Sequence, residues 1–381
     1  EMGIIYLGPV DGSDMKGILR LLKEASNIEG PVMVHVLTHK GAGYLPAERH
    51  PARFHGTEPF DIETGLPSKP RVKANYTDIF STVMRKLGDR DEKVVAITAA
   101  MTDGTGLKRF HNMFPGRFFD VGIAEEHAVT FAAGLAAAGL KPIFAVYSSF
   151  LQRAYDQILH DVCIQNLPVV FAIDRAGLVG SDGETHQGIF DISYLSTIPN
   201  MTIMAPKNKW ELSDMIKYAV DFPTPIAVRY PRGEAYDGLK EYRQPISVGK
   251  SEWIYRESEI ALVALGSMVK TAEKVHAALR EEGIPASLIN SRFAKPLDTQ
   301  MLMEAASKHT LVVTMEENVI NGGFGEHITR FYNEQGIYVN VLNIAIPDEY
   351  VEHGNVDILY HEVGIDADTI LKRIKEVYHP L

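Results

Sequence analysis

The 381-residue sequence contains one cysteine, Cys163, which excludes an intrachain disulfide framework and favours a reducing compartment. It has no apolar run approaching the roughly 20 residues that a membrane-spanning helix requires. Its 38 basic residues are outnumbered by 49 acidic ones, and the net charge of −11 argues against a nucleic-acid or anionic-membrane surface. The first residues carry neither a basic region nor an apolar signal core. We therefore predict a cytoplasmic protein that binds neither nucleic acid nor membrane.

Two common cofactor signatures are also absent. No Gly-x-Gly-x-x-Gly sequence opens a helix after a strand, which argues against a dinucleotide fingerprint. No set of Cys and His residues has metal-ligand spacing, so we predict no metal site from this chain's own residues. The run from Gly322 to Gly325 could cradle an anion, although a tight helix N-terminus is the simpler interpretation. Cys163 has apolar neighbours and is expected to be a small buried residue.

The sequence does contain a regular alternation of short apolar strands and helical patterns. Such alternation indicates mainly parallel sheets covered on both faces, which is an α/β fold. We predict two successive α/β domains, at residues 71–240 and 247–381, with a polar, irregular boundary at 233–257. The predicted strands are 94–99, 118–121, 142–147, 169–173, 201–204, 226–229, 260–265, 286–290, 311–314 and 339–344, and the predicted helices are 77–87, 125–138, 151–165, 209–220, 269–282, 299–306, 326–333 and 367–377.

Residues 1–70 are predicted to be the C-terminal remnant of a further domain plus an interdomain loop. A strand at Ile4–Tyr6, a helix at Asp14–Asn27 and a strand at Val32–Leu37 precede a loop rich in Gly, Pro and His. Because a strand–helix–strand unit normally pairs with more sheet, we expect the chain to begin inside a domain.

Polar clusters follow four of the predicted strands, at the sheet edge where the carboxyl ends of parallel strands gather ligand-binding residues. In the first cluster, strand Phe118–Val121 runs through Ile123 into a helix opened by Glu125. A carboxylate beside packed apolar surface can keep a proton that a solvated one would lose, which favours acid–base work for Glu125. The alternative is a first-turn Glu that complements the helix dipole, a role that also suits Glu126.

The other three clusters combine aromatic, cationic and titratable side chains. Tyr147 and Phe150 present rings that can stack on a flat heterocycle, with Arg153 further along, although a hydrophobic staple at the helix start is the alternative. A Gly-rich loop after strand 169–173 carries a His suited to proton transfer near neutral pH. Paired Arg side chains at the end of strand 226–229 suit phosphate, because the guanidinium fork matches phosphate oxygens. The residues are Arg175, Asp182 and His186 in the Gly-rich loop, for which a solvated loop is the alternative, and Arg229 and Arg232 in the last cluster.

Together these segments closely resemble the 1-deoxy-D-xylulose-5-phosphate synthases, thiamine-diphosphate enzymes of the transketolase superfamily, over essentially the whole chain. The resemblance implies a transferase that condenses pyruvate with glyceraldehyde 3-phosphate, releases carbon dioxide and feeds isoprenoid, thiamine and pyridoxal phosphate synthesis. It also implies a pyrimidine-binding domain, a transketolase C-terminal domain that mainly supports the dimer, and a homodimer. The matching stretches are residues 7–12, 40–44, 54–55, 95–101, 120–130, 147–157, 174–188 and 230–233.

The resemblance further implies a role for each matched residue. Glu125 matches the catalytic Glu that hydrogen-bonds the aminopyrimidine of thiamine diphosphate and promotes its imino tautomer. Asp182 and His186 match polar groups near the reacting centre. The cofactor-binding matches are Ile123, Phe150 (whose ring stacks on the pyrimidine), Arg153 and Lys40, and the substrate-binding matches are His55 together with Tyr147, Arg175 and Arg232 around the aldehyde phosphate.

One part of the family pattern has no counterpart here. The family's Gly-Asp-Gly and a following Asn hold Mg²⁺ and the cofactor diphosphate, so these ligands are expected in a missing N-terminal domain. Smaller departures are Ser13, Glu126 and Glu184, where the family usually has His, Gln and a small residue or Pro. We therefore expect a catalytic half that is inactive without that domain, and a separate N-terminal chain is one way in which the domain could be supplied. The alternatives are a transketolase-like subunit of a split enzyme with another acceptor, or a non-catalytic dimerising module.

Overall fold

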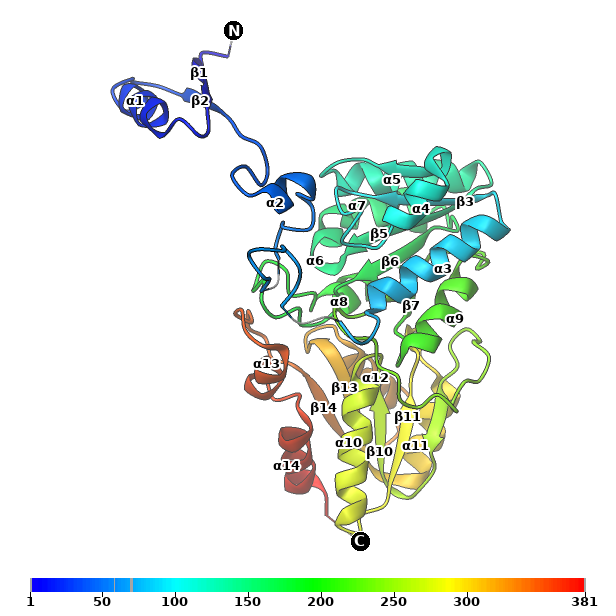
Figure 1. The fold of residues 1–381 in the computed structure, drawn as a ribbon. Coiled ribbons are helices and arrows are strands. Elements are labelled where there is room, and N and C mark those ends of the chain that lie inside the picture. The colour runs from blue at the N-terminus through cyan, green and yellow to red at the C-terminus, as the bar shows by residue number, and fades with distance from the viewer. Residues whose placement is uncertain (1, 58, 69–70, 380–381) are drawn as a thin grey trace. The chain divides into compact units, whose positions relative to one another are not determined.

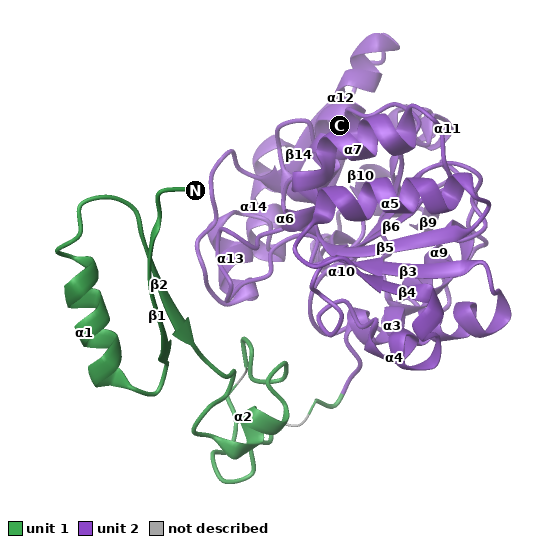
Figure 2. Ribbon diagram, turned by 90° about the horizontal axis from the view of Figure 1, so that it is seen from above, with its two compact units in different colours: residues 1–72 green, residues 73–381 purple. Residues whose placement is uncertain are grey.

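The computed structural model describes residues 2–57, 59–68 and 71–379, in two compact units, residues 1–72 and 73–381 (Figure 2). The first unit contains β1 (Ile5–Asp11), α1 (Met15–Ala25), β2 (Val32–Leu37) and α2 (Leu45–Arg49), and β1 pairs with β2 in parallel. Helix α1 begins after Asp14, whose carboxylate accepts a hydrogen bond from the Gly17 amide at 3.0 Å. The strand–helix–strand prediction is confirmed, and the predicted boundary at residue 70 lies outside the described residues.

The first half of the second unit is built on a seven-stranded sheet with the strand order β12-β7-β8-β6-β5-β3-β4, parallel except for β12 (Figure 1). Alternate residues of each strand enter different cores: Phe144 packs toward α5, and its neighbour Ala145 packs toward α3 and α9. The elements are α3 (Tyr76–Arg90), β3 (Val94–Thr98), α4 (Lys108–Met113), β4 (Phe118–Asp120), α5 (Glu125–Ala137), β5 (Lys141–Tyr147), α6 (Ser148–Leu151), α7 (Tyr155–Gln157), β6 (Val170–Asp174), α8 (Asp191–Ser196), β7 (Thr202–Met204), α9 (Lys209–Ala219) and β8 (Ile226–Arg229).

The second half is built on a five-stranded sheet with the order β14-β13-β10-β11-β9, parallel except for β9. Both sheets are covered on both faces, so the predicted α/β class is confirmed. The elements are β9 (Glu252–Tyr255), β10 (Glu259–Ala264), α10 (Met268–Glu281), β11 (Ala286–Asn290), β12 (Phe293–Lys295), α11 (Thr299–Lys308), β13 (His309–Val319), α12 (Phe324–Glu334), β14 (Asn340–Ile346), α13 (Val356–Glu362) and α14 (Ala367–Val377).

Three local predictions are wrong. Strand β9 lies inside the stretch 233–257 that was expected to be irregular, because its Glu252 is buried in an ion pair instead of being solvated. The expected single helix at 151–165 is α6, a 3-10 turn, α7 and a π-helical turn at Ile158–Cys163. The buried residues of this segment keep helical spacing across the changes between α, 3-10 and π turns. The sequence pattern therefore does not predict these changes. Strand β12 was not predicted and crosses from the second half to pair with β7.

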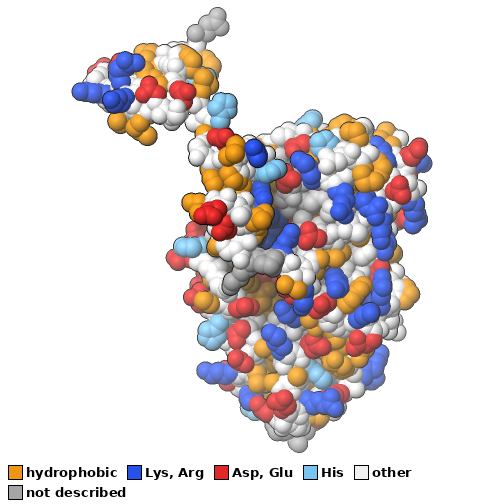
Figure 3. All heavy atoms as spheres, viewed as in Figure 1, with side chains coloured by type: hydrophobic (Ala, Val, Ile, Leu, Met, Phe, Trp, Pro, Cys, Tyr) orange, Lys and Arg blue, Asp and Glu red, His pale blue; other side chains and the backbone are white. Residues whose placement is uncertain are grey.

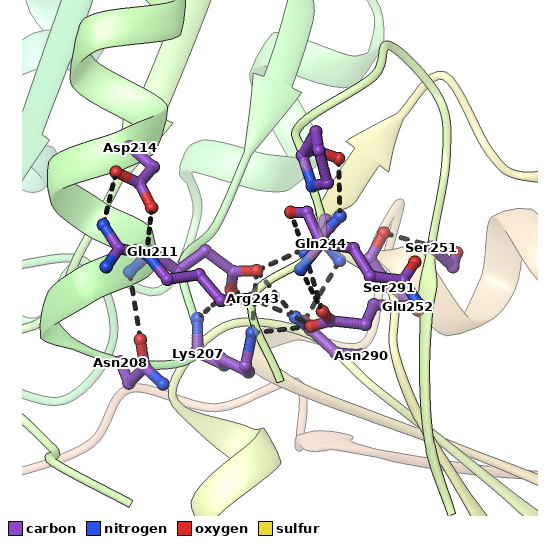
Figure 4. Close-up of polar contacts among 12 residues, drawn as sticks. Lys207, Asn208, Glu211, Asp214, Arg243, Gln244, Ser251, Glu252, Asn290 and Ser291 are labelled. Carbon is purple, nitrogen blue, oxygen red and sulfur yellow. Dashed lines mark hydrogen bonds and ion pairs between the residues drawn. The ribbon is translucent and has the colours of Figure 1, made fainter. Parts of the chain in front are cut away.

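A buried ionic cluster joins the two halves of the second unit (Figure 4). Lys207 Nζ lies 3.0 Å from a Glu211 carboxylate oxygen and 2.7 Å from a Glu252 carboxylate oxygen. Arg292 contacts the same two carboxylates at 2.8 and 3.0 Å, and the Asn290 amide donates to Glu211 at 3.0 Å. None of these five residues is more than 3% exposed. Two cations therefore neutralise two carboxylates without help from water.

The surface of the second unit is mixed in character. The face shown in Figure 3 carries interspersed basic and acidic side chains with scattered hydrophobic ones. Within the described parts of the chain, no helix combines the length and apolarity needed to cross a bilayer. Cys163 is buried as predicted, and burial raises the pKa of its thiol to about 12.

Candidate active site

The four predicted polar clusters lie at one edge of the seven-stranded sheet. Strands β8, β6, β5, β3 and β4 are parallel and adjacent in that order, so their carboxyl ends are side by side (Figure 1). The loop into α5 follows β4, helix α6 follows β5, the Gly-rich loop follows β6, and Arg232 follows β8. The topology therefore brings together residues that are up to about a hundred positions apart in the sequence.

Glu125 opens α5 and is only 1% exposed. Its Oε1 accepts a hydrogen bond from Arg153 Nη1 at 2.7 Å. Its Oε2 is buried and has no hydrogen-bond partner among the described residues. Because an unsatisfied buried oxygen is costly, the arrangement suits a donor that is not part of the chain. The adjacent Glu126 is exposed and fits the helix-dipole alternative instead.

Three rings, those of Tyr147, Phe150 and His186, form an aromatic wall beside this carboxylate. The Tyr147 and Phe150 rings stack with centroids 5.7 Å apart and planes inclined by 24°. The His186 ring meets the Phe150 ring edge-on at 5.2 Å. The Arg153 guanidinium lies 4.9 Å from the Phe150 centroid, so Arg153 links the ring to Glu125. Three clusters that the sequence places in separate segments thus meet at Phe150.

Arg175 extends the wall with a positive charge. Its guanidinium carbon lies 3.7 Å from the Tyr147 centroid, and its Nη1 donates to the Gly104 carbonyl at 3.0 Å. Arg175 has a φ of 61°, a left-handed conformation that non-glycine residues adopt at some energetic cost and that often marks functional sites. Burial raises the pKa of Tyr147, and the charge of Arg175 opposes that rise. Sequence reasoning missed Gly104, where a Cβ would lie 1.7 Å from the Tyr147 hydroxyl.

The Gly-rich loop and the end of β8 are joined by an ion pair. Arg232 Nη1 donates to an Asp182 carboxylate oxygen at 2.8 Å, and both side chains are partly exposed. Arg229, which the sequence paired with Arg232 for phosphate, is instead buried, with its Nε 2.6 Å from Asp191. Arg229 is therefore a structural residue, because its guanidinium is buried and held by both Asp191 and the Glu317 carbonyl, whereas the Arg232 side chain is partly exposed.

The remaining predicted site residues are Ile123, Lys40 and His55. Ile123 lies in the loop before α5 and is 79% exposed. Lys40 and His55 belong to the first unit, which is described by itself. Their proposed approach to the cofactor stays a prediction.

The glycine-rich run before α12 is a helix N-terminus, as the simpler interpretation held. The carboxyl group of Glu316 accepts hydrogen bonds from the Phe324 and Gly325 amides at 2.8 Å each, so the acceptor at this N-terminus is the protein's own. In residues 2–57, 59–68 and 71–379, no group of three or more His, Cys, Asp or Glu is arranged to hold a metal ion.

Three domain families match the sequence. Residues 72–237 match the transketolase pyrimidine binding domain, and residues 249–370 match the transketolase C-terminal domain. Residues 1–38 match a family described as 1-deoxy-D-xylulose-5-phosphate synthase. Together these matches cover most of the chain.

Curated relatives agree with the domain matches. A 1-deoxy-D-xylulose-5-phosphate synthase of Lachnoclostridium phytofermentans is 55% identical over 377 residues, which are 98% of this chain and 60% of the relative. One of Caldanaerobacter subterraneus is 49% identical over 381 residues, 99% of this chain and 61% of the relative. The chain thus spans about 60% of the length of the curated relatives it matches.

Solved transketolases share the fold. A split-gene transketolase, described as an inactive beta4 tetramer, superposes with a TM-score of 0.71 at 26% identity, over 79% of this chain and 97% of that one. The Campylobacter jejuni transketolase superposes with a TM-score of 0.65 at 16% identity, over 98% of this chain and 67% of that one. These findings confirm the resemblance inferred from the motifs: the chain belongs to the transketolase superfamily and is similar to the 1-deoxy-D-xylulose-5-phosphate synthases.

Proposed function

We propose that this chain is the pyrimidine-binding and C-terminal part of a thiamine-diphosphate-dependent 1-deoxy-D-xylulose-5-phosphate synthase, which condenses pyruvate with glyceraldehyde 3-phosphate. The observation that carries the proposal is the buried Glu125 carboxylate, with Oε1 held by Arg153 and Oε2 without a partner. A protonated ring nitrogen of the cofactor's aminopyrimidine is a donor of the kind that Oε2 lacks. The half-buried Phe150 ring supplies an adjacent flat surface for that heterocycle.

Each residue of the candidate site has its own role in the proposed reaction. When bound, thiamine diphosphate supplies the nucleophilic carbon of the reaction. Glu125 holds or returns a proton at the pyrimidine ring, and Arg153 fixes the orientation of its carboxylate. Arg175 and Arg232 offer guanidinium groups to the aldehyde phosphate, with Tyr147 beside Arg175. His186 stands against Phe150 as a proton carrier near the reacting atoms, and Asp182 orients Arg232.

The family's pattern for Mg²⁺ and the cofactor diphosphate, a Gly-Asp-Gly followed by an Asn, does not occur in this sequence. We propose that Mg²⁺ and the diphosphate are held by the domain that the longer relatives carry in addition. Homodimerisation, a cytoplasmic location and the supply of isoprenoid, thiamine and pyridoxal phosphate synthesis belong to this same proposal.

A second candidate is a subunit of a split transketolase with another acceptor. The similarity to one such chain over 97% of its length favours it as an alternative. Acceptor specificity separates the two, since only the synthase uses glyceraldehyde 3-phosphate with pyruvate as donor.

The test is calorimetry with thiamine diphosphate and Mg²⁺, on the chain together with the diphosphate-binding domain of its relatives. We expect Glu125→Ala to abolish measurable cofactor binding, and Glu125→Gln to lower turnover by about 10²–10⁴-fold, the usual contribution of a positioned acid–base group. The matched control is Glu126→Gln, which changes the exposed neighbour and should leave both unchanged. Unaltered binding and turnover in Glu125→Ala would show that Glu125 has no such role.

A further inference from the structure

A buried carboxylate in the C-terminal half contacts the Gly-rich loop of the candidate site, although it lies outside the motifs that the sequence singled out. Glu317 lies on β13 and is 1% exposed. Its Oε1 accepts a hydrogen bond from the Leu178 amide at 2.7 Å, and its Oε2 accepts one from Ser267 Oγ at 2.5 Å. Burial raises the pKa of Glu317, while the hydrogen bonds from Ser267 and Leu178 oppose that rise.

The contact with Leu178 falls at the neck of the Gly-rich loop. Gly177 and Gly188 close this neck with reciprocal backbone hydrogen bonds of 2.6 and 2.8 Å. The Glu317 carboxylate packs so closely on Gly177 that a Cβ there would lie 2.3 Å from its carboxyl carbon. Everything between the two glycines, including Asp182 and His186, projects from this neck.

The same strand supports the neighbouring junction through its backbone. Arg229 Nη2 donates to the Glu317 carbonyl at 3.1 Å, and the Arg229 guanidinium also binds Asp191. Asp191 in turn accepts a hydrogen bond from Ser148 Oγ at 3.1 Å, at the first residue of the helix that carries Phe150. One residue of β13 therefore connects to both the loop after β6 and the helix after β5.

We propose that Glu317 is a positioning residue: it holds the neck of the 177–188 loop and thereby sets the place of His186 and Asp182 beside Phe150 and Arg232. Its carboxylate contacts the backbone of the loop, Ser267 and Tyr360, so it acts on the site through the loop. The C-terminal half then has a direct part in building the site, in addition to any role in assembly. The catalytic consequence of this inference rests on the function proposed above, and its structural part does not.

The chain offers a matched set of variants. Glu317→Ala removes the acceptor of the Leu178 amide and the carboxylate that packs on Gly177. Glu317→Gln keeps a carbonyl oxygen for Leu178 and an amide that can donate to Ser267. Glu316→Ala is the control, because Glu316 is equally buried on the same strand but binds the first two amides of α12 instead of the loop.

The experiment is amide hydrogen exchange of the full chain, read at residues 178–188. We expect exchange to accelerate at least tenfold in Glu317→Ala, to stay near wild type in Glu317→Gln, and to be unchanged in Glu316→Ala. Unchanged loop exchange in a folded Glu317→Ala protein overturns the proposal. If Glu317→Ala does not fold, the double variant Ser267→Ala/Tyr360→Phe, which removes both side-chain donors to the carboxylate, decides on the same readout: accelerated loop exchange supports the proposal and unchanged exchange overturns it.

Kinetics then separate the two proposals. With the diphosphate-binding domain present, we expect Glu317→Ala to lower kcat by about tenfold or more and Glu317→Gln to restore it. A loosened loop without any kinetic change would contradict the proposed function and leave the positioning of the loop intact. A kinetic change without a loosened loop would refute the positioning by Glu317.

Discussion

At the scale of single residues, the candidate site depends on how guanidinium groups are used. Arg153 is committed to Glu125 and Arg229 to Asp191, each at a distance below 2.8 Å. Arg175 lies over the Tyr147 ring, and its Nη1 contacts both the Gly104 carbonyl and, at 3.3 Å, the Asp174 carboxylate, an arrangement that leaves further donors of its planar fork. The positions of these side chains, more than their type, therefore decide which of them meets a phosphorylated substrate.

Arg175→Ala should raise the KM for glyceraldehyde 3-phosphate far more than the KM for pyruvate. Loss of a charge-assisted hydrogen bond costs about 1.5–3 kcal/mol, which corresponds to about 10–100-fold in KM. Neither Arg nor Ala is favoured at this left-handed position, so the substitution adds no new backbone strain. Steady-state kinetics measure both constants, and Arg232→Ala is expected to behave in the same way. The control is Arg243→Ala, whose exposed ion pair with Asp214 lies outside the site; equal effects on both substrates would rule out a phosphate-binding role.

The sequence could predict most of these residues because each follows a strand in the chain. It could not predict what each one touches. Arg229 and Arg232 are three positions apart and look equivalent in the sequence, yet one is buried and the other partly exposed. Gly104 and Glu317 carry no local signal at all, since their importance comes from the approach of a distant ring or loop.

At the scale of elements, the strongly periodic strands and helices were predictable and the joining pieces were not. Strand β12 has three residues and lies in a sheet whose other strands come from the first half of the unit, so its pairing is a tertiary effect. Strand β9 could not be predicted, because Glu252 makes the segment polar in sequence although this side chain is buried in the structure. Both elements contribute to the connection between the two sheets, where local sequence has the least influence.

Glu252→Gln should destabilise the protein by about 3–5 kcal/mol, because it leaves Lys207 and Arg292 buried with too little negative charge. Burial tends to raise the pKa of Glu252, but the Lys207 ammonium, the Gln244 amide and the Arg292 charge together outweigh it, so the net pKa is lowered. The stabilisation is therefore complete above the ordinary pKa of 4.5 and is lost as the pH falls through the lowered value. Urea unfolding at neutral pH measures the difference.

The control for this substitution is Glu304→Gln, which removes a carboxylate that pairs with Arg256 and Lys308 at the surface. Exposed pairs contribute about 0–1 kcal/mol, so this variant should unfold near the wild-type midpoint. Equal losses in Glu252→Gln and Glu304→Gln would mean that the buried cluster does not stabilise the junction of the two sheets.

At the scale of the whole molecule, stability should carry a pH dependence that originates in one buried acid. Burial raises the pKa of Glu316 to about 8, against a lowering by hydrogen bonds from the Gly325 and Phe324 amides. Between the ordinary value of 4.5 and about 8, the folded state holds a proton that the unfolded state has released. The free energy of unfolding contributed by Glu316 therefore falls as the pH rises through this window, by up to about 1.4 kcal/mol per pH unit.

Glu316→Gln should remove this slope, because the amide fills the same space and does not titrate. Unfolding free energies of wild type and variant, measured from pH 5 to 8, are expected to diverge steadily in favour of the variant. Burial lowers the pKa of His276 and of His327, which gives stability of the opposite slope around pH 6.5. Both histidines are present in the two proteins, so their contribution cancels in the difference. Parallel curves would show that Glu316 is ionised in the folded protein and that the α12 N-terminus, together with nearby charges, compensates its burial in full.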